Sequence, residues 1–495
     1  MTGTRATRSP TLGGALAPVI AMVVLYVAGA LAMGSSAELL IVVLLGAAAV
    51  AGVVAVRLGR SWDDIQRATG EKLASVLPVL LILLAIGALI GSWVFSGTIP
   101  FLVYWGIQLI NPQYLALTAF LATVMMSSFT GTSWGSAGTM GVAFMATAGA
   151  LDAPLPAVAG AVISGAYFGD KMSPLSDSTI ICSMAANVEL FRHIRHLFYT
   201  TTPSLVLCLI LYTFAAPLTP VSSGGLPESA RAVLADIDAA YRLHWLVLLP
   251  PAVVTICIVK RVPAVLAIVL SALVAVALGA VLQGFAARDG LIAAVSGFRL
   301  DMLTAVGVDP TGVSANFARL VQRGGLYSMA TTLIVVIAAF LLAGAMDVSG
   351  SLNLLIERLL QSVRSVFGLI ASTMTAGATM VGLTSHGGVT ALVIGGLFQK
   401  AYRDRGLGPE NLSRTLEDSI TITEPLMPWT VSGVYMATTV GVPTLQYAPW
   451  AAFCYGGPIF SLLLAALYSR TRFGLKPLEP GTPDREPGTG NPPAK

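Results

Sequence analysis

The chain has 495 residues, of which 55% are hydrophobic and only 11% are charged, and its mean hydropathy is +0.81. Soluble chains carry roughly 25% charged residues, so this composition excludes an ordinary soluble domain. The net charge of +4 is modest, and no basic cluster interleaved with aromatic residues points to a nucleic-acid partner.

Long apolar stretches begin near the N-terminus and recur along the chain. Clear examples are residues 14–33, 39–56, 73–95 and 263–283. Each is long enough to cross a bilayer as a helix, and none alternates polar and apolar residues as membrane β-strands do. The sequence therefore predicts an all-α polytopic membrane protein with about 14 crossings, some of them broken or re-entrant.

An internal duplication divides the chain at a spacing of about 252 residues. The matching segments are 96–98 with 349–351, 132–135 with 384–387, and 174–175 with 425–426. The predicted parts are residues 1–72 (two transmembrane helices and a cytoplasmic loop), 73–218 (the first transport repeat), 219–327 (two outer loops around two linking helices), 328–469 (the second repeat) and 470–495 (a disordered cytoplasmic tail).

The positive charges predict how the two halves are oriented. Lys and Arg residues in short loops accumulate on the cytoplasmic side. This places both termini and the basic loops near residues 57–72, 192–195 and 400–414 inside. The loops equivalent to the last two, near 443–447 and 150–156, lack basic residues. We therefore expect two inverted-topology repeats whose broken helices meet near the bilayer midplane, as in alternating-access transporters.

The first half carries an acidic segment interrupted by a proline. It contains Asp170, Lys171, Ser173 and Asp177, and Pro174 breaks the helix there. Buried carboxylates, hydroxyls and freed carbonyls suit sodium, so Asp170 and Asp177 are predicted sodium and proton sites with Ser173 as an oxygen ligand. Lys171 is either a counter-ion of Asp170 or Asp177 or a substrate contact. The preceding stretch rich in Gly, Ser and Thr contributes Thr132 and Ser133 as candidate ion ligands.

The second half repeats this arrangement. Its acidic segment contains Asp418, a third predicted sodium ligand, with Thr423 and Glu424, and the preceding polar stretch offers Thr384, Ser385 and His386. Glu417 reads as an acid at a helix start near the membrane edge. His193 and His196 read as surface residues of a cytoplasmic loop.

These features together predict a secondary active antiporter that exchanges sodium for protons, because one carboxylate can bind either ion but not both. The alternative is a sodium- or proton-coupled exchanger of small organic anions or amino acids, in which Lys171 or a half-helix N-terminus holds a carboxylate. A channel is a further alternative. No P-loop, catalytic triad or zinc motif is present, so neither an enzyme nor a cofactor is predicted.

Several runs resemble the NhaC-type sodium/proton antiporter family. They are residues 87–100, 131–135, 164–177, 411–418 and 425–429, and the resemblance extends over about 58–467. It implies a multi-pass fold of the cell (inner) membrane and sodium, proton or related exchange, since the family also includes carriers of malate and lactate. Glu424 stands where the family pattern has a serine, and the stretch at 386–388 also departs from it. The oligomeric state, including a homodimer, is left open.

Overall fold

The computed structural model describes residues 9–33, 37–75, 77–109, 111–214, 228–260, 262–352, 354–355, 358, 365–385 and 387–479. These residues are helical throughout, apart from turns and one isolated bridge between Leu407 and Pro477. The prediction of an all-α protein is confirmed. His386 and residues 480–495 of the predicted tail lie outside the described residues.

Four groups of helices follow one another along the chain. The N-terminal group is α1 (Leu12–Met33), α2 (Ala37–Arg57) and α3 (Trp62–Ser75). The first half contains α4 (Leu77–Phe95), α5 (Thr98–Leu109), η1 (Pro112–Tyr114), α6 (Leu115–Thr130), α7 (Ser133–Ser136), η2 (Ala137–Gly141), α8 (Val142–Ala150), α9 (Leu155–Met172), α10 (Asp177–Ala185) and α11 (Leu190–Phe214). The linking group contains α12 (Glu228–Ala240), η4 (Trp245–Leu248), α13 (Leu249–Val259), α14 (Ala264–Leu278), η5 (Gly279–Gln283), α15 (Ala287–Ser296), η6 (Leu300–Val306), α16 (Ala315–Val321) and η7 (Leu326–Met329). The second half contains α17 (Ala330–Val348), α19 (Val366–Thr384), α20 (Gly387–Arg403), α21 (Pro409–Leu416), η8 (Glu417–Thr421), η9 (Glu424–Leu426), α22 (Val431–Val440), α23 (Thr444–Tyr447), η10 (Ala448–Trp450) and α24 (Ala452–Thr471).

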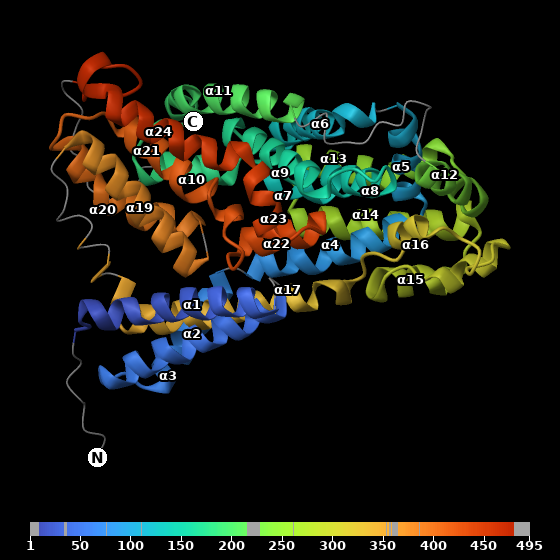
Figure 1. Ribbon diagram of the computed structural model, residues 1–495, viewed down its shortest axis with the longest axis horizontal. Helices are drawn as coiled ribbons and strands as arrows, with labels where there is room; N and C mark the ends of the chain where they lie inside the picture. Colours follow the sequence, from blue (N-terminus) through green and yellow to red (C-terminus); the bar gives the residue numbers. More distant parts are fainter. Residues whose placement is uncertain are drawn as a thin grey trace.

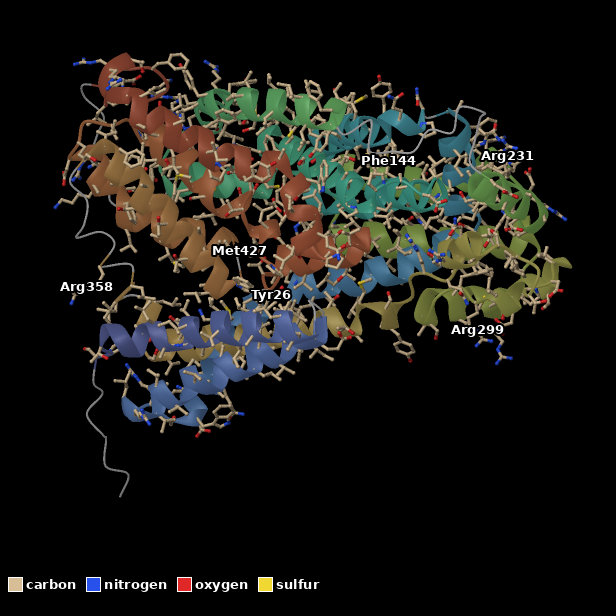
Figure 2. The ribbon with its side chains drawn as sticks, viewed as in Figure 1. Tyr26, Phe144, Arg231, Arg299, Arg358 and Met427 are labelled. Atoms are coloured by element: carbon tan, nitrogen blue, oxygen red, sulfur yellow. The ribbon has the colours of Figure 1, made fainter. Side chains whose placement is uncertain are left out.

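The long helices run roughly along the long axis of the molecule (Figure 1). Helices α1, α2, α3 and α17 form a layer on one side, where α17 packs against both α2 and α3. Figure 2 shows Arg231 and Arg299 at one end of the bundle and Arg358 at the other. Charged groups at the two ends and exposed apolar side chains on the long helices suit a bundle that crosses a bilayer along this axis.

Seven described helices are long and apolar enough to cross a membrane, or ten if each sharply bent pair counts as one span. The sequence predicts about 14 crossings. The difference arises because several apolar stretches are broken into short helices. Residues 133–150 form α7, η2 and α8, and residues 409–440 form α21, η8, η9 and α22. The chain is a multi-pass membrane protein with fewer continuous spans than its hydropathy suggests.

Parts of the duplication have the same local geometry. The Ser96 hydroxyl lies 2.8 Å from the Thr98 hydroxyl, and the Ser349 hydroxyl lies 2.6 Å from that of Ser351. The glycine between each pair has a positive φ, 81° at Gly97 and 71° at Gly350. The same tight turn therefore follows an apolar helix in each half, at residues 96–98 and at residues 349–351. The inverted orientation of the halves stays a prediction.

The two halves are interleaved in the folded protein. Helix α10 of the first half packs against α20 of the second, and α22 of the second half packs against η2 of the first. One buried apolar cluster accordingly joins Cys182 of α10 with Ile394 of α20 and Leu416 of α21. Segments that are distant in sequence are brought together where both halves have broken helices.

The first ten residues of the predicted tail are ordered. Helix α24 continues to Thr471, and the carbonyl of Gly474 accepts a hydrogen bond from the buried Arg414 side chain at 2.5 Å. The backbone N–H of Leu478 donates to the Gly406 carbonyl at 2.7 Å. The prediction of disorder is wrong for residues 470–479, because these backbone contacts hold the segment against the α20–α21 turn.

Two glycines let α9 approach α6 closely beside the acidic segment. A Cβ on Gly169 would lie 2.4 Å from the backbone nitrogen of Ser128, and one on Gly165 would lie 2.5 Å from the Phe120 carbonyl oxygen. We expect Gly169→Ala to push the helices apart and lower stability by about 1–3 kcal/mol, the usual cost of overpacking. Thermal unfolding in detergent measures this, with Gly396→Ala as a control. A Cβ on Gly396 meets no atom within 4 Å, so an equal loss in both variants would contradict the packing argument.

Candidate functional site

Both halves contain a helix that stops and restarts within the bundle. Helix α6 ends at Thr130, and Gly131 is left-handed with φ 67° before α7 starts at Ser133. Helix α19 ends at Thr384, and Ser385 is left-handed with φ 55° before α20 starts at Gly387. A positive φ is uncommon for a residue other than glycine. Each break places free backbone N–H groups at the start of a new helix.

The two breaks also determine which residues of the halves correspond. The Thr130 hydroxyl lies 3.3 Å from that of Ser136, and the Thr384 hydroxyl lies 2.9 Å from that of Thr390. Thr384 is therefore the counterpart of Thr130, and Ser385 that of Gly131. The pairing of Thr132 with Thr384 predicted from the sequence is therefore shifted by two residues. It rests on similar residue types, whereas the helix breaks align Thr384 with Thr130.

The acidic segments follow the same plan. Asp170 lies in the last turn of α9, where the Ser173 N–H donates to its carbonyl at 3.2 Å, and Ser176 then caps α10. Glu424 lies in η9 after the π-helical turn η8, and Thr430 then caps α22. Each half thus presents an acid six residues before a hydroxyl that starts the next helix. Asp170 and Glu424 are counterparts by this criterion.

Asp170 and Glu424 line one cavity of about 270 Å³. Their residues are only 9% and 7% exposed. Asp177 also lines the cavity, but it is exposed. The other lining residues are Ser133, Trp134, Tyr167, Ser178, Ile181, Ser385, Gly387, Gly388, Thr421, Val431 and Ser432. None of the described lining residues is basic, and their ionisable side chains are the three carboxyl groups and the Tyr167 phenol.

Each buried acid lies against the start of a restarted helix. The Asp170 carboxylate faces the backbone N–H and hydroxyl of Ser133 and the Ser176 hydroxyl. The Glu424 carboxylate is within reach of the Gly387 N–H, and its Oε1 lies 3.4 Å from the Ser432 nitrogen. Backbone N–H groups and hydroxyls stabilise the ionised form of a buried carboxyl group, while burial favours the neutral form.

Lys171 and Asp418 form a separate ion pair outside this cavity. Lys171 Nζ lies 2.5 Å from Asp418 Oδ1, and both side chains have 0% exposure. The Thr200 hydroxyl donates to the same oxygen at 3.2 Å, and Lys171 Nζ lies 5.6 Å from the centre of the Phe453 ring. The expectation that Lys171 neutralises Asp170 or Asp177 is wrong, because Lys171 is paired across the two halves.

The remaining predicted ligands have other partners. The hydroxyls of Thr132 and Thr423 bond to backbone groups of their own segments, and the Ser173 hydroxyl accepts the Leu175 N–H at 3.3 Å. The Thr384 hydroxyl pairs with Thr390, so none of these four lines the cavity. Ser133 and Ser385 do line it. The prediction for His386 lies outside the described residues.

Sequence reasoning missed two groups of residues around the cavity. Trp134 stacks on Tyr435 with ring centres 4.2 Å apart, and the Tyr435 hydroxyl donates to the Trp134 carbonyl at 2.6 Å. Trp134 lines the cavity, and Tyr435 of the second half packs against its ring. Ser178, Thr421 and Ser432 also line the cavity, and their proximity to Asp177 and Glu424 was a signal available in the sequence.

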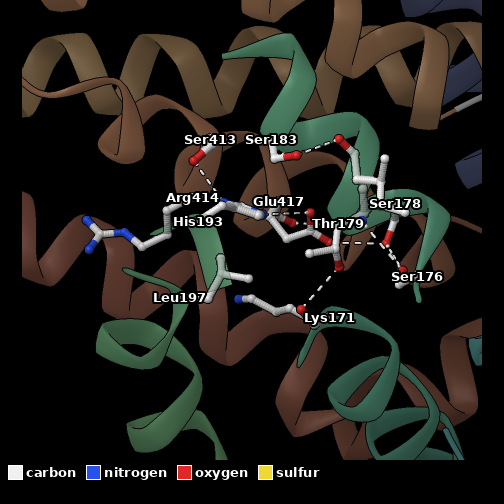
Figure 3. Close-up of polar contacts among 12 residues, drawn as sticks. Lys171, Ser176, Ser178, Thr179, Ser183, His193, Leu197, Ser413, Arg414 and Glu417 are labelled. Atoms are coloured by element: carbon white, nitrogen blue, oxygen red, sulfur yellow. Dashed lines mark hydrogen bonds and ion pairs between the residues drawn. The ribbon is translucent and has the colours of Figure 1, made fainter. Parts of the chain in front are cut away.

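A further group of polar residues, which includes His193 and Glu417 (Figure 3), lies in a different environment from the one that the sequence predicts. His193 and His196 are buried, at 0% and 1% exposure, so placing them on a surface loop is wrong. Glu417 is also buried, and His193 Nδ1 lies 2.8 Å from the Ser413 hydroxyl. The first turns of α11 were read as a loop because they are polar, whereas α11 and α21 turn these polar faces toward each other.

Comparison with known proteins gives consistent matches. A family model described as the Na+/H+ antiporter family matches residues 3–189 and 165–467. An uncharacterized Na(+)/H(+) antiporter of Haemophilus influenzae is 42% identical over 94% of this chain and 98% of its own length. The Na(+)/H(+) antiporter NhaC of Alkalihalophilus pseudofirmus is 34% identical over 82% of this chain and 85% of its own. A malate-2H(+)/Na(+)-lactate antiporter of Bacillus subtilis is 31% identical over 85% and 87%.

Proposed function

Because the chain belongs to the Na+/H+ antiporter family, as the resemblance of its motifs predicted, we propose that it exchanges sodium for protons at the cavity of Asp170 and Glu424. The family makes it an antiporter. The choice of ions and the site are our proposal.

The observation that carries this proposal is the charge of the cavity. Two buried carboxylates and one exposed carboxylate line it, together with hydroxyl groups and without a described basic residue. Sodium is a small hard cation and prefers such oxygen ligands. A malate or lactate anion would instead face like charges at close range in a medium of low dielectric constant. Lys171 offers no counter-charge, since Asp418 already binds it.

Exchange follows from competition between the two ions. A carboxylate that holds a proton has lost the negative charge that attracts sodium, and a carboxylate bound to sodium binds a proton weakly. If the cavity opens to one side of the membrane at a time, arrival of one ion releases the other. Asp170 and Glu424 come from different halves, so relative movement of the halves would change both ligands together.

The placement of basic residues supports a cytoplasmic position for the segment that follows α24. Arg192 bonds to Glu410, and Lys476 lies 3.9 Å from the same carboxylate. The backbone near Leu407 pairs with Pro477. The basic residues near the start of α11 and at the ends of α20 and α24 therefore lie at one end of the bundle. The positive-inside rule assigns this end to the cytoplasm.

Reconstituted vesicles test the proposed function. With a pH-sensitive dye inside, addition of sodium should move protons in the opposite direction, whereas malate, lactate, amino acids and potassium should not. Proton movement that requires an organic anion or an amino acid would instead support the alternative exchangers. Sodium flux without counter-movement of protons would support a channel.

A further inference from the structure

We infer that Glu417 and His193 relay protons between the cavity and the end of the bundle where α11 meets α21; this inference rests on the proposed sodium/proton exchange. It assigns a role to a buried acid and a buried histidine that do not line the cation cavity. Both residues belong to the cluster in Figure 3.

Glu417 is connected to the cavity through two hydroxyls. Its Oε1 accepts hydrogen bonds from Ser178 at 3.2 Å and from Thr421 at 2.8 Å. Both of these residues line the cavity. Hydroxyl groups can accept one proton while donating another, so they can pass a proton without changing their own charge. Glu417 is therefore one hydroxyl away from the space that holds Asp170 and Glu424.

The second oxygen of Glu417 faces a histidine. Glu417 Oε2 lies 3.7 Å from His193 Nε2, and both atoms are buried without a hydrogen-bond partner. Leaving buried polar atoms unpaired costs about 1–3 kcal/mol each. The gap exceeds a hydrogen bond, yet a small side-chain rotation or one bridging water closes it. An acid and a histidine at this separation are suited to proton transfer.

The relay continues from His193 toward the end of the bundle. His193 Nδ1 lies 2.8 Å from the Ser413 hydroxyl, and that hydroxyl lies 3.1 Å from the Glu410 carbonyl. Glu410 forms an ion pair with Arg192, whose side chain is 43% exposed. The side-chain relay thus ends at Ser413, whose hydrogen bond to the Glu410 carbonyl places it next to this partly hydrated ion pair.

Other charged groups surround the relay but are engaged elsewhere. Lys171 and Asp418 bind each other, and Arg414 Nε lies 4.0 Å from Asp418 Oδ2. His196 Nε2 lies 3.1 Å from the Asn411 amide oxygen. The Cys182 thiol of α10 also faces Glu417. Among these groups, Glu417 and His193 form the acid and base pair that connects the cavity to Ser413 at the contact of α11 with α21.

Each transfer moves one proton and leaves the net charge of the relay unchanged. The hydroxyls, the Glu417 carboxyl group and the His193 ring then reorient before the next transfer. A carboxylic acid in the cavity gives its proton to the Ser178 or Thr421 hydroxyl, which passes its own proton to Glu417. Glu417 then protonates His193 at Nε2, and the imidazolium gives its Nδ1 proton to the Ser413 hydroxyl, which passes its own proton to water at the Arg192–Glu410 end of the bundle. The reverse sequence loads the cavity.

The test compares proton-coupled exchange with exchange of sodium for sodium, which needs no proton path. In vesicles, Glu417→Gln and His193→Gln should each slow sodium-dependent proton movement by about 100-fold, the scale of assisted proton transfer. Uptake of radioactive sodium against unlabelled sodium should stay within about twofold of the unsubstituted protein, because the cavity carboxylates are untouched. Glu417→Asp should recover part of the proton movement.

His196→Gln is the matched control, since His196 lies on the same helix, is equally buried and also contacts α21, but through Asn411. It should keep normal proton movement. Unchanged proton movement in His193→Gln and Glu417→Gln would overturn the relay, as would an equal loss of both exchanges in variants with unchanged thermal unfolding. If Glu417→Gln does not fold, His193→Gln decides alone. Absence of sodium-driven proton movement in the unsubstituted protein would contradict the proposed function itself.

Discussion

Asp170→Asn should abolish sodium-dependent proton movement, lowering its rate by more than about 100-fold. Asparagine keeps the size of the side chain but can neither bind a proton nor provide a full negative charge for sodium. The carboxylate is buried and faces the restarted helix at Ser133. Proton movement in vesicles after a sodium pulse measures the loss, and unchanged thermal unfolding shows that the fold is intact.

Glu424→Gln is the companion variant, because Glu424 occupies the corresponding position in the second half and lines the same cavity. We expect a loss of the same order. Asp309→Asn is the control, since Asp309 is exposed between η6 and α16, and its carboxylate bonds only to Thr311 among the described contacts. Normal exchange in Asp170→Asn would refute a cation site at this cavity.

Asp177 gives an informative comparison. From sequence alone, Asp177→Asn is expected to abolish coupled exchange while leaving folding intact. The carboxylate lines the cavity but is exposed, and hydrated charges attract a cation less strongly than buried ones. The structure therefore favours a smaller loss at Asp177 than at Asp170, and the ratio of the two rates measures the contribution of burial.

Asp418→Ala should destabilise the protein by about 3–5 kcal/mol, because it leaves the Lys171 ammonium buried and unpaired. Lys171→Ala should destabilise the protein by a similar amount, because it leaves the Asp418 carboxylate buried without its ammonium partner. The double variant Lys171→Met/Asp418→Leu removes both charges and keeps the volume, so most of the stability should return. Thermal unfolding of the four proteins in detergent gives the coupling between the two residues.

Transport by the double variant decides the role of Asp418. If the ion pair only joins the two halves, exchange should survive when both charges are removed together. If Asp418 is a sodium ligand, as its position in the sequence suggests, exchange should be lost although stability has recovered. Equal stability of all four proteins would mean that the pair contributes nothing to the fold.

The sequence by itself determined the environment and the chemistry of this protein. Its apolar composition requires a bilayer, and the matched helix breaks and acidic segments point to a duplicated site. The runs around Asp170 and Asp418 resemble the antiporter family to which the chain belongs. These conclusions depend on average hydropathy and on local patterns, which can be read without knowing any distant contact.

Only the tertiary structure decided which acids share a cavity and which are bound elsewhere. Lys171 is adjacent to Asp170 but pairs with Asp418, which is 247 residues away. Glu417 and His193 are brought face to face by the packing of α11, α10 and η8. The physical reason is that neighbouring residues on a helix point in different directions. The packing of the two halves against each other therefore determines which group each side chain contacts. Adjacency in the sequence does not determine it.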